Sequence, residues 1–229
     1  METSEFKEHY LRIKRKNEAI ALKDNNKNAL ERMFAHETLG TLQNQVEGYS
    51  EIYREGLIEY SEFKGVIENL KQDMPKYLTL EKLTEVDFTK EGLRDNSQLD
   101  MYNLFDRERK SLEGKYNLKV NIQGHAYQNI NEAALTALVS THMGDAAKWT
   151  PEGESINIQL SQDSNNTKIT IENPAADQEI RSEFGLGQQI GTKYTKAFLD
   201  TLNGTTSQTS FENQNGQKIF KKEFYIPKK

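Results

Sequence analysis

Residues 35–53 decide the first half of the fold, and they read AHETLGTLQNQVEGYSEIY. Apolar side chains recur in this stretch at intervals of four and three residues, at Ala35, Leu39, Leu42, Val46, Tyr49 and Tyr53. Alternating intervals of four and three place apolar residues on one stripe of an α-helix, as in a heptad seam. The stretch therefore predicts a long helix that packs along one face.

A second apolar stripe follows and predicts a partner helix. It consists of Phe63, Val66, Ile67, Leu70 and Met74. The two stripes predict an antiparallel helical hairpin with its turn near residues 55–61, and Pro75 is expected to break or kink the second helix. A two-helix hairpin cannot bury both faces of its seam alone. We expect a homodimer that closes a four-helix bundle, with packing on the chain's own C-terminal domain as the alternative.

The pattern after Asn96 changes to short alternating segments between helices. It predicts helices over 97–115, 131–149 and 187–203, and strands over 118–122, 156–160, 168–171, 206–212 and 219–226. Asn131 is placed to cap one helix and Gly204 to end another. The expected fold class is α+β, with helices on one face of a mixed sheet. The expected division is a helical extension (1–25), the hairpin (26–80), a connector (81–96) and the sandwich (97–229).

The composition narrows the classes of function. The chain has 229 residues and a net charge of -5, so no nucleic-acid partner is expected. Cysteine is absent, which excludes disulfides, thiol catalysis and thiolate metal sites. No apolar run approaches the roughly 20 residues of a membrane span, and residues 1–16 lack the apolar core of a signal peptide. We therefore expect a cytoplasmic protein without a membrane partner.

The first chemical feature is the pair His36-Glu37, which lies beside the heptad seam. A neutral imidazole nitrogen can accept a phosphoryl group, and a neighbouring carboxylate can hold the ring's tautomer or take up its proton. The alternative is an exposed His–Glu pair on a charged helix, which has no chemical role. The pair alone does not separate the two interpretations.

The second feature is a set of segments in the C-terminal half. Asp145-Ala146-Ala147-Lys148-Trp149-Thr150-Pro151-Glu152-Gly153 closes a helix and leads into a strand. Gly185-Leu186-Gly187 opens the next long helix, and Asn203-Gly204 closes it. Glycines at a helix start let backbone N–H groups approach a phosphate, although a tight turn without a ligand uses the same residues.

In this order and spacing, the segments resemble the transmitter region of bacterial sensor histidine kinases from about Asn26 onward. His36-Glu37 with Leu42 looks like the H box, residues 148–153 look like the tail of the N box, and Gly185-Leu186-Gly187 looks like the G2 box. The resemblance implies a homodimeric four-helix bundle followed by a GHKL-type ATPase sandwich. It also implies His36 as phosphoacceptor and a response-regulator receiver domain as partner.

The chain departs from this family in the N box. The family's two asparagines fall on Thr141 and Asp145, and the second asparagine is the family's magnesium ligand. Asp145 could still hold magnesium, because carboxylates are good ligands for it. His142 and Gly144 also break the expected local pattern.

The chain departs again in the G1 box and the ATP lid. Asn173 stands where the family has the Asp that reads adenine, and Ala175 and Asp177 replace two glycines. Their Cβ atoms crowd the backbone beside the base. Only residues 178–184 separate this segment from Gly185, which is too short for a flap over a triphosphate.

The H box departs less. Thr41 replaces the family's proline, so the helix should run straight past His36. Gly40 lies one helical turn after His36, where many family members carry a Thr or Asn that positions a water for phosphatase action. With Leu39 and Gln43 it is expected to form part of the docking face for the receiver domain.

Three functions remain open at this level. The first is a phosphorelay protein that moves phosphoryl groups between response-regulator aspartates through His36, with Glu37 orienting its ring. The second is a soluble histidine kinase that phosphorylates His36 from ATP, and the third is a non-catalytic pseudokinase scaffold. The retained His36-Glu37 and the eroded nucleotide boxes favour the first. No cofactor is expected; ATP and magnesium would require a working pocket at Asp145, Asn173, Gly185 and Gly187.

Overall fold

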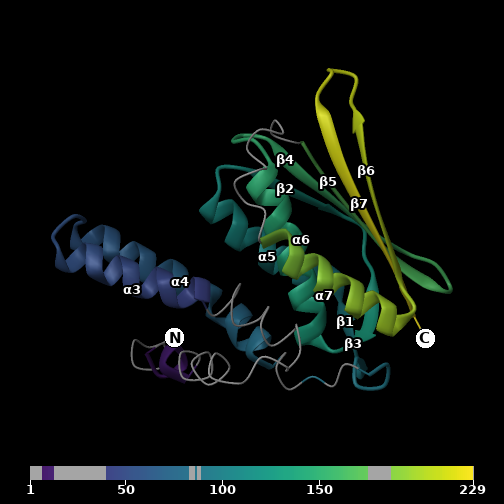
Figure 1. Ribbon diagram of the computed structural model, residues 1–229, viewed down its shortest axis with the longest axis horizontal. Coiled ribbons are helices and arrows are strands. Elements are labelled where there is room, and N and C mark those ends of the chain that lie inside the picture. Colours follow the sequence, from purple (N-terminus) through teal and green to yellow (C-terminus); the bar gives the residue numbers. More distant parts are fainter. Residues whose placement is uncertain (1–6, 13–39, 83–85, 87–88, 175–186, 229) are drawn as a thin grey trace. The chain divides into compact units, whose positions relative to one another are not determined.

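The structure is a computed structural model, and it describes residues 7–12, 40–82, 86, 89–174 and 187–228. The chain divides into two compact units, Met1–Glu85 and Val86–Lys229. Figure 1 shows the helices and strands of each unit. Among the described residues, no helix is both long enough and apolar enough to cross a membrane.

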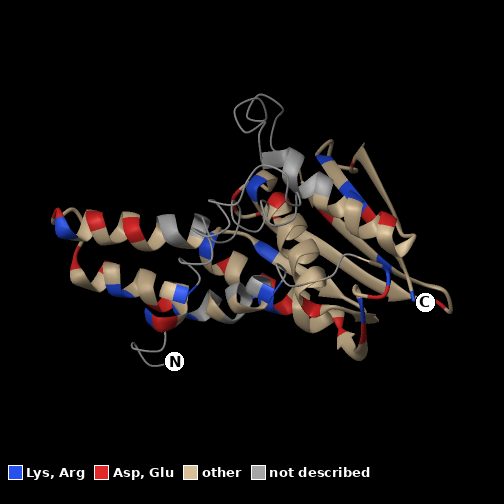
Figure 2. Cartoon of the chain, turned by 60° about the horizontal axis from the view of Figure 1, so that its bottom comes forward, with Lys and Arg blue, Asp and Glu red and all other residues tan. Residues whose placement is uncertain are grey.

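The described part of the first unit is a helical hairpin, as the two apolar stripes predict. Helix α3 spans Gly40–Arg54 and α4 spans Tyr60–Glu81, with the turn between them. Tyr53 stacks on Phe63 across the hairpin with ring centroids 4.8 Å apart. Residues 7–12 are helical as well, and the Tyr10 hydroxyl donates to Glu47 of α3 at 3.4 Å. Charged residues of both signs occur along α3 and α4 (Figure 2).

Of the two effects predicted for Pro75, a break of the second helix does not occur, because α4 continues through Pro75 to Glu81. A proline inside a helix costs about 3 kcal/mol through its lost hydrogen bond and ring clash. Leu70 and Met74 on the preceding turn are buried, at 4% and 0% exposed. Burial of each such side chain contributes about 1.5–3 kcal/mol, so packing outweighs the proline.

The second unit is a layer of helices on a mixed sheet, as the predicted fold class requires. Its elements are β1 (Arg94–Asp100), α5 (Met101–Lys115), β2 (Lys119–Gln123), β3 (Tyr127–Ile130), α6 (Glu132–Trp149), β4 (Ser155–Gln162), β5 (Asn166–Pro174), α7 (Gly187–Leu202), β6 (Thr205–Glu212) and β7 (Lys218–Pro227). The main sheet has the strand order β2-β4-β5-β7-β6. Strands β2 and β4 pair in parallel, and the other neighbours pair antiparallel. Helices α5, α6 and α7 lie on one face of this sheet (Figure 1).

Two strands were not predicted. Residues 94–100 form β1, which pairs with β3 in a separate two-stranded sheet, whereas the sequence pattern predicts a connector to residue 96 and then a helix from 97. The helix begins instead at Met101, because the Asp100 carboxylate accepts the Tyr102 N–H at 2.9 Å and caps the first turn. The pairing between β1 and β3 therefore overrides the helical pattern up to Asp100.

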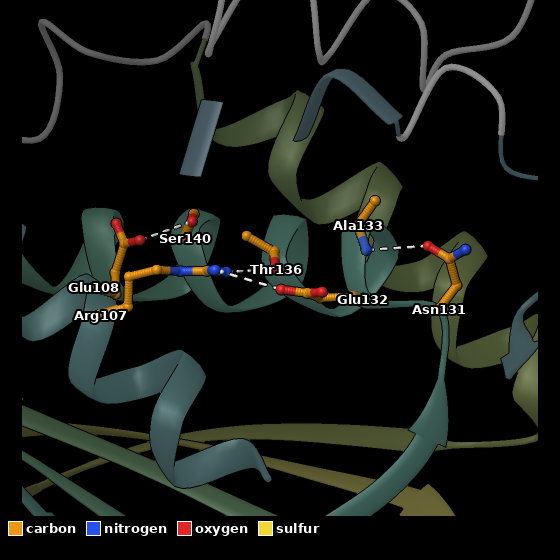
Figure 3. A network of polar contacts seen from close by, with 7 residues as sticks. All are labelled: Arg107, Glu108, Asn131, Glu132, Ala133, Thr136 and Ser140. Atoms are coloured by element: carbon orange, nitrogen blue, oxygen red, sulfur yellow. Dashed lines mark hydrogen bonds and ion pairs between the residues drawn. The ribbon is translucent and has the colours of Figure 1, made fainter. Parts of the chain in front are cut away.

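The helices α5 and α6 are joined by side-chain contacts along one side (Figure 3). The Arg107 guanidinium donates to Thr136 Oγ1 at 3.0 Å and pairs with Glu132 at 3.4 Å. One turn on, the Ser140 hydroxyl donates to the buried carboxylate of Glu108 at 2.9 Å. These contacts fix the position of α6, whose C-terminal half forms one wall of the pocket described below.

Helix α7 ends at Leu202, close to the predicted end, and Asn203 after it has a left-handed backbone at φ 58°. Gly204 is required for a different reason: a Cβ there would lie 2.7 Å from the Tyr225 carbonyl oxygen and 2.9 Å from Leu199 Cδ2. Close approach of β7 and the helix, rather than backbone twist, selects glycine at this position.

Candidate functional site

The phosphoacceptor segment lies at the edge of what the structure describes. His36, Glu37 and Leu39 are outside the described residues, and so is the side chain of Gln43. Gly40 is the first residue of α3. The prediction that these residues form one docking face therefore stays a prediction.

The second unit carries a pocket of about 220 Å³ between α6 and the main sheet. One wall is a face of the C-terminal half of α6, formed by His142, Asp145, Ala146 and Trp149. Their spacing of three, four and seven residues from His142 places them on one side of the helix. Of the residues in the degenerate N box, Asp145 and His142 thus line one cavity.

The floor of the pocket is formed by neighbouring strands of the sheet. Lys222 of β7 is in register with Ile171 of β5 on one side and Gln208 of β6 on the other. In the next row, Phe220 of β7 is in register with Asn173 of β5. All five residues line the pocket, so Lys222 stands among both apolar and amide side chains on this floor.

Asn173, the residue that replaces the family's adenine-reading Asp, is buried at 8% exposed. Its amide nitrogen donates to the Pro174 carbonyl oxygen at 2.9 Å. Ala175, Asp177 and Gly185 lie outside the described residues, and Gly187 is the first residue of α7. The structure therefore brings Asn173 and Asp145 to the same pocket and places Gly187 at the start of α7.

His142 is the most buried polar group of the pocket, at 4% exposed. Burial, with a contribution from the charge of Lys222, holds the pKa of its imidazole well below the usual value. The ring is therefore neutral, with one donor and one acceptor nitrogen. Lys222 Nζ lies 3.2 Å from Nδ1, and Thr195 Oγ1 lies 2.7 Å from Nε2. Because an ammonium only donates, Nδ1 is the acceptor and Nε2 carries the proton toward Thr195.

Lys221, Lys222 and Asp145 are the charged residues that line the pocket. Burial lowers the pKa of Lys222, and the negative charge of Asp145 acts in the opposite direction. Burial likewise raises the pKa of Asp145, against the charges of Lys148 and Lys222. Burial thus disfavours the charged forms of both Lys222 and Asp145.

These residues do not fit the magnesium that the family's fold implies. Asp145 stands at the ligand position, but Lys221 and Lys222 line the same pocket, and their positive charges oppose the approach of a divalent cation. Within the described ranges, no three His, Asp or Glu side chains are grouped as a metal site. A magnesium ion needs several oxygen ligands and water, and a buried ammonium offers neither.

Sequence reasoning missed Lys222, although the signal was present. Alternate residues of β7 lie on the same face of the strand, and on one face they are Phe220, Lys222, Phe224 and Ile226. A lysine therefore interrupts a stripe of apolar residues. Phe224 and Ile226 are buried at 1% and 0% exposed. A lysine on the face of a strand that points toward the core indicates a charge with a functional or structural role.

No model of a protein family matches the chain, and no curated protein matches it. Among solved structures it is similar to a bacterial phosphotransferase, with 11% identity over 85% of this chain and 93% of that one and a TM-score of 0.53. It is also similar to a histidine kinase from Burkholderia phymatum (10% identity, 95% and 98% covered, TM-score 0.46). A third is the histidine kinase AdeS of Acinetobacter baumannii (17% identity, 83% and 96% covered, TM-score 0.43). The chain therefore shares its fold with the solved bacterial phosphotransferase.

Proposed function

We propose that this chain is a histidine phosphotransfer protein that moves phosphoryl groups between response-regulator aspartates through His36. The observation that carries the proposal is the lining of the kinase-like pocket: Lys222 lies there beside the buried His142, with Nζ 3.2 Å from Nδ1, in the cavity that Asp145, the residue at the magnesium position, also lines. A pocket of this kind is a poor source of phosphoryl groups from ATP. The fold shared with a solved bacterial phosphotransferase supports the same function.

In the proposed reaction, His36 attacks the phosphorus of a phosphoaspartate on a receiver domain. The P–N bond forms as the P–O bond to the aspartate breaks, and the carboxylate leaves with the electron pair. Transfer to a second receiver reverses these steps. Glu37 orients the imidazole so that the attacking nitrogen is unprotonated, and the receiver supplies the cation that neutralises the transferring group. Leu39, Gly40 and Gln43 belong to the docking face.

We further propose that the hairpin dimerises into a four-helix bundle. The support is a set of exposed apolar side chains toward the turn of the hairpin: Tyr49 and Tyr53 at 38%, Tyr60 at 65% and Leu57 at 69%. Tyr49 and Tyr53 belong to the heptad seam of α3. A second copy of the hairpin would cover this seam, and light scattering of the full chain measures the mass directly.

The test of phosphotransfer uses the full chain with a panel of receiver domains that have been phosphorylated with acetyl phosphate. We expect an acid-labile phosphoryl group to appear on the wild-type chain and to be lost in His36→Gln. The matched control is His125→Gln, which removes an exposed histidine of the second unit and should leave transfer unchanged.

A parallel incubation with labelled ATP and magnesium separates the competing functions. Label on His36 from ATP would establish a kinase and overturn the proposal. Absence of transfer from every receiver encoded in the same genome would leave a scaffold that binds regulators without chemistry, and would equally overturn it.

A further inference from the structure

The pocket between α6 and the main sheet is lined by an ammonium and a carboxylate that form no ion pair with each other, because no oxygen of Asp145 lies within 4.0 Å of Lys222 Nζ. We propose that this pocket binds a small zwitterion of the α-amino-acid class. The ligand's carboxylate lies on Lys222, its ammonium lies on Asp145, and its apolar side chain packs on the aromatic lining. The inference goes beyond phosphotransfer and does not depend on His36.

The size of the pocket limits the ligand. Its volume is about 220 Å³. Sites for drug-sized ligands span roughly 300–1,000 Å³, so this pocket suits a smaller molecule. An amino acid is of that smaller size, whereas a nucleotide with its ribose and phosphates is larger.

Lys222 supplies a cation that is held in place. Its Nζ lies 3.2 Å from His142 Nδ1 and 5.7 Å from the centre of the Phe224 ring. The other ring nitrogen of His142, Nε2, lies 2.7 Å from Thr195 Oγ1 on α7, so the imidazole is held from both sides. An ammonium has three N–H donors and the imidazole accepts one, which leaves two for a carboxylate. Gln208, in register with Lys222 on β6, adds an amide donor to the same lining.

Asp145 supplies the opposite charge from the helix. It lies three residues after His142 on the same side of α6 and lines the pocket. Within the described ranges, its carboxylate has no hydrogen-bond or ion-pair partner. An α-amino acid carries an ammonium and a carboxylate on one carbon atom. It can therefore join Asp145 to Lys222 through two charge-assisted contacts, although the two side chains do not contact each other.

The other titratable groups of the lining already have partners. Lys221 Nζ lies 3.4 Å from a carboxylate oxygen of Glu172 and 3.3 Å from one of Glu223. His142 is neutral, and both of its ring nitrogens are engaged. One ammonium and one carboxylate therefore remain for a ligand. A molecule with one charge of each sign compensates both, whereas a simple anion or cation leaves one of them uncompensated in a partly buried site.

Apolar side chains form the rest of the lining and indicate the kind of amino acid. They are Ala146 and Trp149 of α6, Ile171 of β5 and Phe220 of β7. Aromatic rings offer large apolar faces for a flat or branched side chain. The lining therefore favours phenylalanine or leucine over a polar amino acid.

The experiment compares L-phenylalanine with two analogues that each lack one charge. Phenethylamine has no carboxylate, and 3-phenylpropanoate has no ammonium. The full chain is titrated with each compound, and with L-leucine, by calorimetry and by the fluorescence of Trp149, the only tryptophan in the chain. We expect the wild type to bind L-phenylalanine at least about tenfold more tightly than either analogue, because each analogue leaves one charged group without its contact.

Two variants test the two contacts separately. Lys222→Met should reduce the preference for L-phenylalanine over phenethylamine to about twofold or less, because the ligand's carboxylate then has no ammonium to bind. Asp145→Asn should do the same to the preference over 3-phenylpropanoate. Lys148→Met is the matched control and should keep both preferences. Lys148 is exposed and does not line the pocket, although its charge also acts on Asp145.

Cooperative urea unfolding shows whether each variant is folded, and Lys222→Gln or Asp145→Ala replaces a variant that is not. The inference is overturned if the wild type binds neither L-phenylalanine nor L-leucine, or if it binds L-phenylalanine and the two analogues equally. Unchanged preferences in folded variants of Lys222 and Asp145 would overturn it as well. Each of these results leaves phosphotransfer through His36 standing, because that reaction is measured with receiver domains alone.

Discussion

Protonation of His142 should limit the stability of the second unit in mild acid. Its imidazole is 4% exposed, accepts from Lys222 and donates to Thr195, and its pKa is held well below the usual 6.5 by burial. The unfolded chain binds a proton near pH 6.5, whereas the folded chain does not. Stability is therefore lost as the pH falls below 6.5, because the unfolded state then holds more protons.

The magnitude follows from the difference in bound protons. Between pH 7.5 and 5.5, an unfolded imidazole with a pKa of 6.5 gains nearly one proton, which lowers the free energy of unfolding by about 1.4 kcal/mol. Two charged groups share the pocket with His142, and both remain in His142→Gln, so comparison of the two proteins separates the imidazole from them. Burial raises the pKa of Asp145, so its protonation favours the folded state as the pH falls, and burial lowers the pKa of Lys222, so its deprotonation favours the folded state as the pH rises. Carboxylates with lowered pKa values, such as Asp106, titrate in stronger acid.

The assay is urea unfolding of the full chain at pH 7.5 and 5.5, followed by Trp149 fluorescence. His142→Gln can accept from Lys222 and donate to Thr195 without titrating, so we expect its stability to change by about 1.4 kcal/mol less than that of the wild type over this range. His125→Gln, at an exposed site, should keep the wild-type dependence. An equal loss of stability in the wild type and His142→Gln would refute the reasoning.

Two further predictions concern the frame around the pocket. Gly124→Ala should destabilise the second unit by roughly 2 kcal/mol or more, because the new Cβ lies 2.0 Å from the Leu160 carbonyl oxygen at a φ of +80°. Gly144→Ala on α6 should stabilise the second unit by up to about 1 kcal/mol, because the new Cβ has no atom within 4 Å. Urea unfolding measures both variants, and equal effects of Gly124→Ala and Gly144→Ala would contradict the expected contrast. Asn131→Ala should cost about 1 kcal/mol, because its side chain accepts two N–H groups at the start of α6. Asn129→Ala is the control, and an equal loss in both would argue against the cap.

Local sequence signals predicted the parts of the fold that local chemistry determines. Asn131 caps α6, and the turn chemistry between β4 and β5 gives the antiparallel hairpin. Strand β3 has only four residues and is defined by pairing with the distant β1, so no local pattern marks it. Pro75 was misread because a local rule was applied where the burial of Leu70 and Met74 decides.

The pocket was predicted only in part, for a related reason. The N-box motif led to Asp145 and to the odd His142, since these residues are neighbours in the sequence. Lys222 reaches them from 80 residues beyond His142, through the order of strands in the sheet. Lys222 could have been placed only by its position among the alternate residues of β7 that face the core. The sequence does not identify that face of the strand until the order of strands in the sheet is known.

We propose that the phosphoryl group on His36 comes from an aspartate. Mass spectrometry, at neutral to basic pH, of the peptide that contains His36 tests this after the full chain has been mixed with a phosphorylated receiver domain. We expect phosphohistidine at His36 that a second, unphosphorylated receiver removes, with none formed from ATP and magnesium alone. Phosphohistidine formed from ATP alone, or none formed from any receiver, would contradict it.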